Sequence, residues 1–313
     1  MCLLRSSESL HRFGHFFAAS IVRPHRCPRT AARLLSLVFL CLVPSAKAAT
    51  IQVPSDQPTI QAGINAANNG DTVLVAPGTY YENIDFKGKA ITVSSSSGSA
   101  DTIIEGGGIG GLATVSFKSG ELRSSVLSGF TVQNGGYAIG STIEAGGVFV
   151  FGASPTISNN IITGNACNGV SVTGGAALIT GNIISDTTGP NYGYCSAAGS
   201  GLALSRSGAA GGSTVIGNTI ENNTEGIADG GGIAIWAAEG CVIEDNVIRN
   251  NVSGPGGVTV ANTDSLIFVQ NIVYGNKAVN EFNTPGPVGG GWAHHSNSRT
   301  QWSFSSLLRH HCE

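Results

Sequence analysis

Histidine and basic side chains are scarce through most of this chain. No histidine lies between Ala49 and Gly291, and from Ala49 onward 18 acidic residues outnumber 9 basic ones. The missing histidine excludes histidine-dependent acid–base catalysis and histidine metal ligands from that stretch. The acidic balance argues against nucleic acid as a partner, since a phosphate backbone requires Lys and Arg. An acidic polysaccharide would likewise need a local basic site.

Apolar runs long enough to span a membrane are also missing. The run Leu34–Val43 is too short to cross a bilayer comfortably. Arginines at positions 23, 26, 29 and 33 precede it and the small-x-small sequence Ala46-Lys47-Ala48 follows it, which is typical of a secretory leader. We interpret residues 1–48 as a signal peptide cleaved after Ala48. The mature chain is then expected to be secreted, periplasmic or on the cell surface, with no transmembrane span.

Glycine and asparagine, by contrast, mark a repeat between Gly146 and Asn276. Five copies each open with Gly and a short apolar alternation, as in Gly147-Val148-Phe149-Val150, and the opening glycines are 22, 32, 31 and 25 residues apart. This period is typical of a solenoid. A second apolar run in each copy ends at an Asn: Asn160, Asn182, Asn218, Asn246 and Asn271. A further Asn follows five residues later in four copies: Asn165, Asn223, Asn251 and Asn276.

Each copy predicts three short strands separated by corners, because its apolar residues alternate with a period of two. Stacked copies would bury Val148, Val150, Ile157 and Ile162 in a narrow interior and pair only with their neighbours. The middle corner is predicted to bend at the Asn itself, since Asn tolerates a left-handed conformation. Stacking would align the first set of asparagines in a ladder of amide hydrogen bonds.

The flanks of the repeat region differ from its body. Residues 49–120 are predicted to form an N-terminal cap and the first coils, and residues 121–290 the repeats. Ile60, Ile64 and Ala67 have helical spacing, which indicates a short helix that blocks the edge of the first coil. Residues 291–313 lose the rhythm and are interpreted as an irregular tail, non-native or frameshifted. The alternative is a disordered natural tail, and no metal site is predicted from its histidines.

The repeat resembles the right-handed parallel β-helix of the pectin-lyase-like superfamily, over about Thr50 to Asn276. The resemblance implies an all-β fold of three-strand coils with an Asn ladder and a short N-terminal capping helix. It leaves the activity open, because the superfamily contains lyases, hydrolases, esterases, epimerases and adhesins. In the enzymes, sugars usually lie along the outer face of the first strand of each coil.

That outer face carries no charge in the five copies. By alternation it consists of Phe149 and Phe151, Ser171 and Thr173, Ala203 and Ser205, Ala234 and Trp236, Thr259 and Ala261. Glycoside hydrolysis needs two carboxylates, and lyase chemistry needs a base. The paired-Asp and Gly-His-Gly motifs of the polygalacturonase-like hydrolases and the arginine motif of the pectin esterases are absent. Phe149 and Trp236 are candidate stacking platforms for sugars, or else isolated surface aromatics.

The remaining candidates lie on loops. Asp186, Glu225 and Asp229, with Arg206, could form a carboxylate cluster that holds Ca²⁺ or a sugar. The alternative is solvated loop charge that keeps the sheet edges soluble. No other cofactor is indicated. Cys167 and Cys195 occupy the same corner of adjacent coils, and export permits oxidation, so a Cys167–Cys195 disulfide is predicted. Cys241 should face the core.

Two functions stay open. The first is an exported, monomeric β-helix without catalytic activity, which binds a polysaccharide or cell-surface glycan or serves as a surface scaffold. The alternative is a polysaccharide-active enzyme, a lyase or glycoside hydrolase, whose reactive coil is cryptic or lies beyond residue 291. The uncharged outer face favours the first function, and the family resemblance favours the second.

Overall fold

The computed structural model of the chain divides into two compact units, residues 1–45 and residues 46–313. The described residues belong to the second unit: 47–108, 112–136, 144–189, 201–206, 211–225, 230–254, 256–279 and, for the backbone, 292–295. The predicted signal peptide therefore lies almost entirely outside the described residues. No helix in the described part of the chain is long and apolar enough to cross a membrane.

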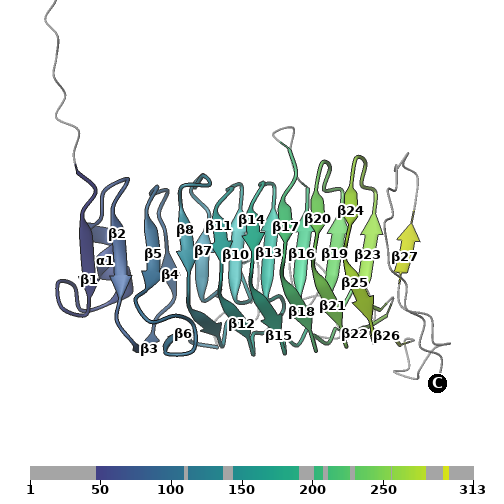
Figure 1. The fold of residues 1–313 in the computed structure, drawn as a ribbon, viewed down its shortest axis with the longest axis horizontal. Helices are drawn as coiled ribbons and strands as arrows, with labels where there is room; N and C mark the ends of the chain where they lie inside the picture. Colours follow the sequence, from purple (N-terminus) through teal and green to yellow (C-terminus); the bar gives the residue numbers. More distant parts are fainter. Residues whose placement is uncertain are drawn as a thin grey trace, which may run out of the picture. The chain divides into compact units, whose positions relative to one another are not determined.

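Successive coils each contribute one strand to three parallel sheets, and the coils follow one another in chain order (Figure 1). Sheet A contains β1 (Thr50–Val53), β2 (Thr72–Val75), β5 (Thr92–Ser95), β8 (Val126–Ser128), β11 (Thr156–Ser158), β14 (Leu178–Thr180), β17 (Thr214–Ile216), β20 (Val242–Glu244) and β24 (Ile267–Val269). Sheet B contains β3 (Gly78–Tyr81), β6 (Thr102–Glu105), β9 (Thr131–Gln133), β12 (Ile161–Thr163), β15 (Ile183–Ser185), β18 (Thr219–Glu221), β21 (Val247–Arg249) and β25 (Ile272–Tyr274).

Sheet C is formed by the strand that opens each copy of the repeat. It contains β4 (Ile84–Asp85), β7 (Val115–Phe117), β10 (Val148–Phe151), β13 (Val170–Thr173), β16 (Leu202–Ser205), β19 (Ile233–Trp236), β23 (Val258–Ala261) and β27 (Trp292–His295). Two short strands, β22 (Val252–Ser253) and β26 (Lys277–Ala278), pair separately. Val148 aligns with Val170, and Leu202 with Ile233, so the repeat period read from the sequence is confirmed.

Side chains of one parity in all three sheets fill a single continuous core. Val148, Val150, Ile157 and Ile162 belong to it and are almost fully buried, as predicted. Cys241 also lies in this core, as predicted. Cys167 is buried, with 2% of its surface exposed, at the corner before β13. Its predicted partner, Cys195, lies outside the described residues, so the Cys167–Cys195 pairing stays a prediction.

The predicted asparagine ladder is confirmed at the corner between sheets A and B. From Asn182 onward, the Oδ1 atom of each ladder Asn accepts hydrogen bonds from the backbone N–H and the Nδ2 amide of the Asn one coil earlier, at 2.9–3.1 Å. The ladder residues are Asn160, Asn182, Asn218, Asn246 and Asn271. A second ladder, from Asn223 through Asn251 to Asn276, follows the same pattern at the corner between sheets B and C.

The prediction that the ladder asparagines themselves bend the corner is wrong. The left-handed conformation is adopted by the residue before each of them, such as Asn159 (φ 56°) and Asp245 (φ 54°). One residue cannot both bend the chain and form the ladder, because a ladder side chain must point into the corner to reach its neighbours. The preceding residue absorbs the sharp turn, where Gly, Asn and Asp are tolerated best.

The predicted capping helix is α1 (Ile60–Ala66), which contacts β1, β2 and β4. Its N-cap, Thr59, accepts a hydrogen bond from Ala62 N, and the Glu82 carboxylate accepts bonds from Ile60 N and Gln61 N. At the other end, Lys89 Nζ donates to three backbone carbonyls, at 2.7–2.8 Å. An isolated helix of seven residues is not stable in water. These caps and the burial of Ile60 and Ile64 hold it over the first coil.

One segment of the tail, residues 292–295, continues the repeat, which the sequence did not predict. The strand β27 pairs in parallel with β23, with Val258 opposite Trp292, and extends sheet C by one strand. The rest of residues 291–313 lies outside the described part of the chain. The interpretation that the tail is non-native stays a prediction.

Candidate functional site

The outer face of sheet C presents two columns of side chains, which we call the sheet C strip. The inner column is Asp85, Ser116, Phe149, Ser171, Ala203, Ala234 and Thr259, aligned by strand register. The outer column is Lys118, Phe151, Thr173, Ser205, Trp236 and Ala261. Both columns have the parity opposite to that of the core residues, because successive side chains of a strand point to opposite faces.

Aromatic rings stand at two places on the strip. Phe151 is 45% exposed on β10, and Trp236 is 50% exposed on β19. Phe149, a predicted stacking platform, is only 3% exposed and stacks on Phe151, with ring centroids 6.2 Å apart and an interplanar angle of 6°. The accessible ring on β10 is therefore that of Phe151, with Phe149 supporting it. Trp236 lies where the sequence predicted an accessible ring.

Hydroxyl groups lie between the two exposed rings. Thr173 Oγ1 and Ser205 Oγ are 2.9 Å apart in the outer column. In the inner column, Ser171 Oγ between the rings and Thr259 Oγ1 on β23, beyond Trp236, are buried and have no hydrogen-bond partner in the described part of the chain. An unsatisfied buried hydroxyl is costly, which points to a buried water at these positions.

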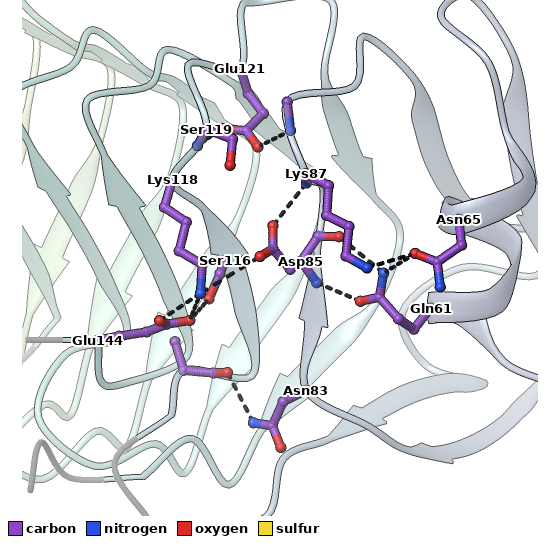
Figure 2. A network of polar contacts seen from close by, with 12 residues as sticks. Gln61, Asn65, Asn83, Asp85, Lys87, Ser116, Lys118, Ser119, Glu121 and Glu144 are labelled. Carbon is purple, nitrogen blue, oxygen red and sulfur yellow. Dashed lines mark hydrogen bonds and ion pairs between the residues drawn. The ribbon is translucent and has the colours of Figure 1, made fainter. Parts of the chain in front are cut away.

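A network of charged residues occupies the N-terminal end of the strip (Figure 2). Lys118 Nζ lies 2.7 Å from Glu144 Oε2 and 3.6 Å from Asp85 Oδ2, and the Ser116 hydroxyl donates to Glu144. Asp85 is held by α1, because Gln61 accepts from Asp85 N at 2.7 Å and donates to Asp85 O at 3.2 Å. Both carboxylates thus contact one ammonium group on the outer face of sheet C.

The protonation state of Lys118 limits what this network can do. Partial burial lowers the pKa of Lys118, but the contacts with Glu144 and Asp85 together outweigh it and raise the pKa above its ordinary value. Lys118 is therefore a cation at neutral pH and cannot accept a proton there. Lyase chemistry needs a base that is free to take a proton. The network is instead suited to bind and orient polar groups.

The loop candidates do not form one site. Asp186 follows β15, and its Oδ2 accepts from Thr163 Oγ1 at 3.3 Å. Glu225 lies at the same corner one coil later, next to the pairing of Thr188 with Thr224. Arg206 follows β16, at the opposite end of the sheet C strands. Asp229 lies outside the described residues. Within the described chain, no group of three or more His, Cys, Asp or Glu side chains could hold a metal ion.

The charged end of the strip was not predicted from the sequence. Asp85 follows Ile84, and Lys118 follows Val115-Ser116-Phe117, with the same alternation that identified the outer face in the repeats. Extending the alternation to these less regular coils would have found both residues. Glu144 lies in the irregular segment before β10, and no pattern in the sequence pointed to it.

The parallel sheets and stacked coils define a parallel β-helix. The chain matches the family described as right-handed beta helix region over residues 60–305, and it belongs to this right-handed β-helix family. A comparison with curated proteins finds no significant match.

Two solved structures are among those similar to this chain. One is a pectin methylesterase mutant in complex with hexasaccharide IV, which is 10% identical with a TM-score of 0.44 and covers 84% of this chain and 91% of its own. The other is an alginate lyase from Paenibacillus sp. str. FPU-7, which is 14% identical with a TM-score of 0.32 and covers 82% of this chain and 94% of its own. The fold assignment stands on the family match and the sheet topology.

Proposed function

We propose that this protein is an exported β-helix that binds a linear glycan along the sheet C strip. The observation that carries the proposal is the pair of exposed rings, Phe151 and Trp236, on one face with hydroxyls between them. Aromatic rings stack on the apolar faces of sugars, and hydroxyls exchange hydrogen bonds with sugar hydroxyls. Export follows from the leader predicted in residues 1–48.

Substituting either exposed ring tests the proposal. We expect Trp236→Ala and Phe151→Ala each to weaken glycan binding about tenfold, because each removes one stacking contact of about 1 kcal/mol or more. Affinity electrophoresis through gels containing soluble polysaccharides would measure the retardation. Tyr81→Ala is a matched control, since Tyr81 is 81% exposed but lies on β3 of sheet B. Equal retardation of all three variants and the wild type would contradict the proposal.

A second candidate function is a polysaccharide-active enzyme, and one observation favours it. Asp85 and Glu144 place two carboxylates beside one cation at the end of the same strip. Glycoside hydrolysis commonly uses such a carboxylate pair. Release of reducing ends from the polysaccharides that bind, lost in both Asp85→Asn and Glu144→Gln, would support the enzyme. Release of unsaturated sugars that absorb in the ultraviolet would indicate a lyase instead.

A further inference from the structure

We infer that the sheet C strip selects an uncharged linear glycan of at least four sugar units over a polyuronate. The inference rests on the proposed glycan binding and adds the charge and the length of the ligand. Three observations support it: the charge around the strip, the pairing of its cations and the spacing of its rings.

The surroundings of the strip are acidic. Glu144 lies at its N-terminal end, Glu225 in the corner before β19 and Glu239 in the turn after β19, whereas the basic residue at the end of these strands is Arg206. A polyuronate carries a negative charge on every sugar, so acidic residues near the strip would repel it, and a single arginine would neutralise only one of its charges. An uncharged glycan has no such cost.

The cations at the end of the strip already have partners. Lys118 contacts Glu144 and Asp85, and Lys87 Nζ donates to Asn65 Oδ1 at 2.9 Å. A sugar carboxylate at Lys118 would compete with Glu144 and Asp85 for one ammonium group and would lie next to their negative charges. The network can still exchange hydrogen bonds with sugar hydroxyls, because the Asp85 and Glu144 oxygens accept from any O–H donor.

The spacing of the rings sets the length of the ligand. Phe151 and Trp236 occupy the same column of β10 and β19, and β13 and β16 lie between these strands. Three rungs of a sheet span roughly 14 Å. One sugar unit extends a linear glycan by about one rung, so a trimer reaches one ring and a tetramer reaches both.

Calorimetric titration with oligosaccharides of two to six units tests the inference. The uncharged probes are β-1,4-linked xylose, mannose and glucose oligomers, and the charged probes are galacturonate and alginate oligomers. We expect binding by an uncharged series, a rise in affinity of about tenfold between three and four units, and little dependence on salt. Trp236→Ala should remove the increase in affinity between three and four units, whereas Arg206→Gln should leave binding unchanged.

Other outcomes overturn different parts of the argument. Preferred binding of a uronate series, weakened by salt or by Arg206→Gln, would overturn the selectivity while leaving glycan binding intact. Binding by an uncharged series without a rise in affinity at four units would overturn the inferred minimum length of the ligand. Failure of every oligomer and of every soluble polysaccharide to bind would overturn the proposed function itself.

A different observation carries a second inference, which rests on the predicted cleavage after Ala48. We infer that this cleavage creates an ion pair that stabilises the first strand of the β-helix. Ala49 N lies 2.8 Å from Asp71 Oδ1, and Asn68 N donates to Asp71 Oδ2 at 2.8 Å. Asp71 is buried at 6% exposure, and Thr72 N donates to Ala49 O at the start of the β1–β2 pairing.

Cleavage would change the donor in this contact from an amide to an ammonium group. A charge-assisted hydrogen bond is about twice as strong as a neutral one. The backbone bonds from Ala49 and then Asn68 hold the pKa of Asp71 below its ordinary value despite burial, so its carboxylate is ionised at neutral pH. The mature N-terminus therefore meets a carboxylate that is already in place.

Two forms of the protein released from a fusion partner test this ion pair. One begins at Ala49 and the other retains Ala46-Lys47-Ala48. We expect the form beginning at Ala49 to melt a few degrees higher at neutral pH, and Asp71→Asn to abolish the difference. Asp56→Asn is the control, because Asp56 is exposed and accepts only from the backbone of Gln52. Equal melting temperatures, or a difference that persists in Asp71→Asn, would overturn the inference.

Discussion

Replacing Asn246 with Leu is expected to lower the free energy of unfolding by about 3–5 kcal/mol. Asn246 Nδ2 donates to Val215 O, Glu244 O and Asn271 Oδ1, and its Oδ1 accepts from the backbone and side chain of Asn218. Leu has a similar volume but can satisfy none of these groups. Each buried polar group left without a partner costs about 1–3 kcal/mol. Denaturant unfolding followed by circular dichroism would measure the loss.

The same substitution at the end of the ladder is the matched control. Asn271 is half-buried and makes its side-chain bonds to Ile243 O, Val269 O and the amide groups of Asn246. It donates to no later Asn in the described chain, so we expect Asn271→Leu to cost clearly less than Asn246→Leu. In a solenoid each coil is stabilised mainly by its neighbours, and an interior defect weakens two interfaces. An unchanged unfolding midpoint for Asn246→Leu would contradict the ladder's energetic role.

The ladder also shows why the fold could be predicted from sequence alone. A narrow coil repeats the same physical requirement in every turn, so the same residue types recur at Asn160, Asn182 and Asn218. Recurrence reveals which positions are buried and which face outward, even without an alignment. The position of the left-handed bend could not be read this way. Gly, Asn, Asp or Gln precedes each ladder asparagine, and sequence alone does not show which of the two adjacent residues has positive φ.

The candidate site was predicted only in part, for a related reason. Trp236 was found because it lies in a regular copy of the repeat. Asp85 and Lys118 lie in the first coils, where α1 and the cap replace the regular pattern. Glu144 lies in a segment without a repeat, so its contact with Lys118 could not be predicted from the sequence. Phe149 was placed on the correct face, but alternation does not show that one ring covers its neighbour.

Replacing Lys89 with Met is expected to destabilise the N-terminal cap by about 2–4 kcal/mol. Lys89 Nζ donates to Ile64 O, Asn65 O and Ala67 O, so it caps the C-terminal end of α1. Hydrogen bonds to charged groups contribute about 1.5–3 kcal/mol each, but they share one side chain and are not additive. A positive charge at a helix C-terminus also interacts favourably with the helix dipole. Met has a similar length and cannot donate.

Loss of the cap should also change how the protein associates. α1 contacts β1, β2 and β4, and unprotected sheet edges pair with other chains. We therefore expect Lys89→Met to elute from a sizing column as larger species as its concentration rises. Lys87→Met is the control, because Lys87 is exposed and its ammonium makes one bond, to Asn65 Oδ1. If both variants unfold at the same denaturant concentration, Lys89 does not hold the helix, and burial of Ile60 and Ile64 alone keeps the first coil closed.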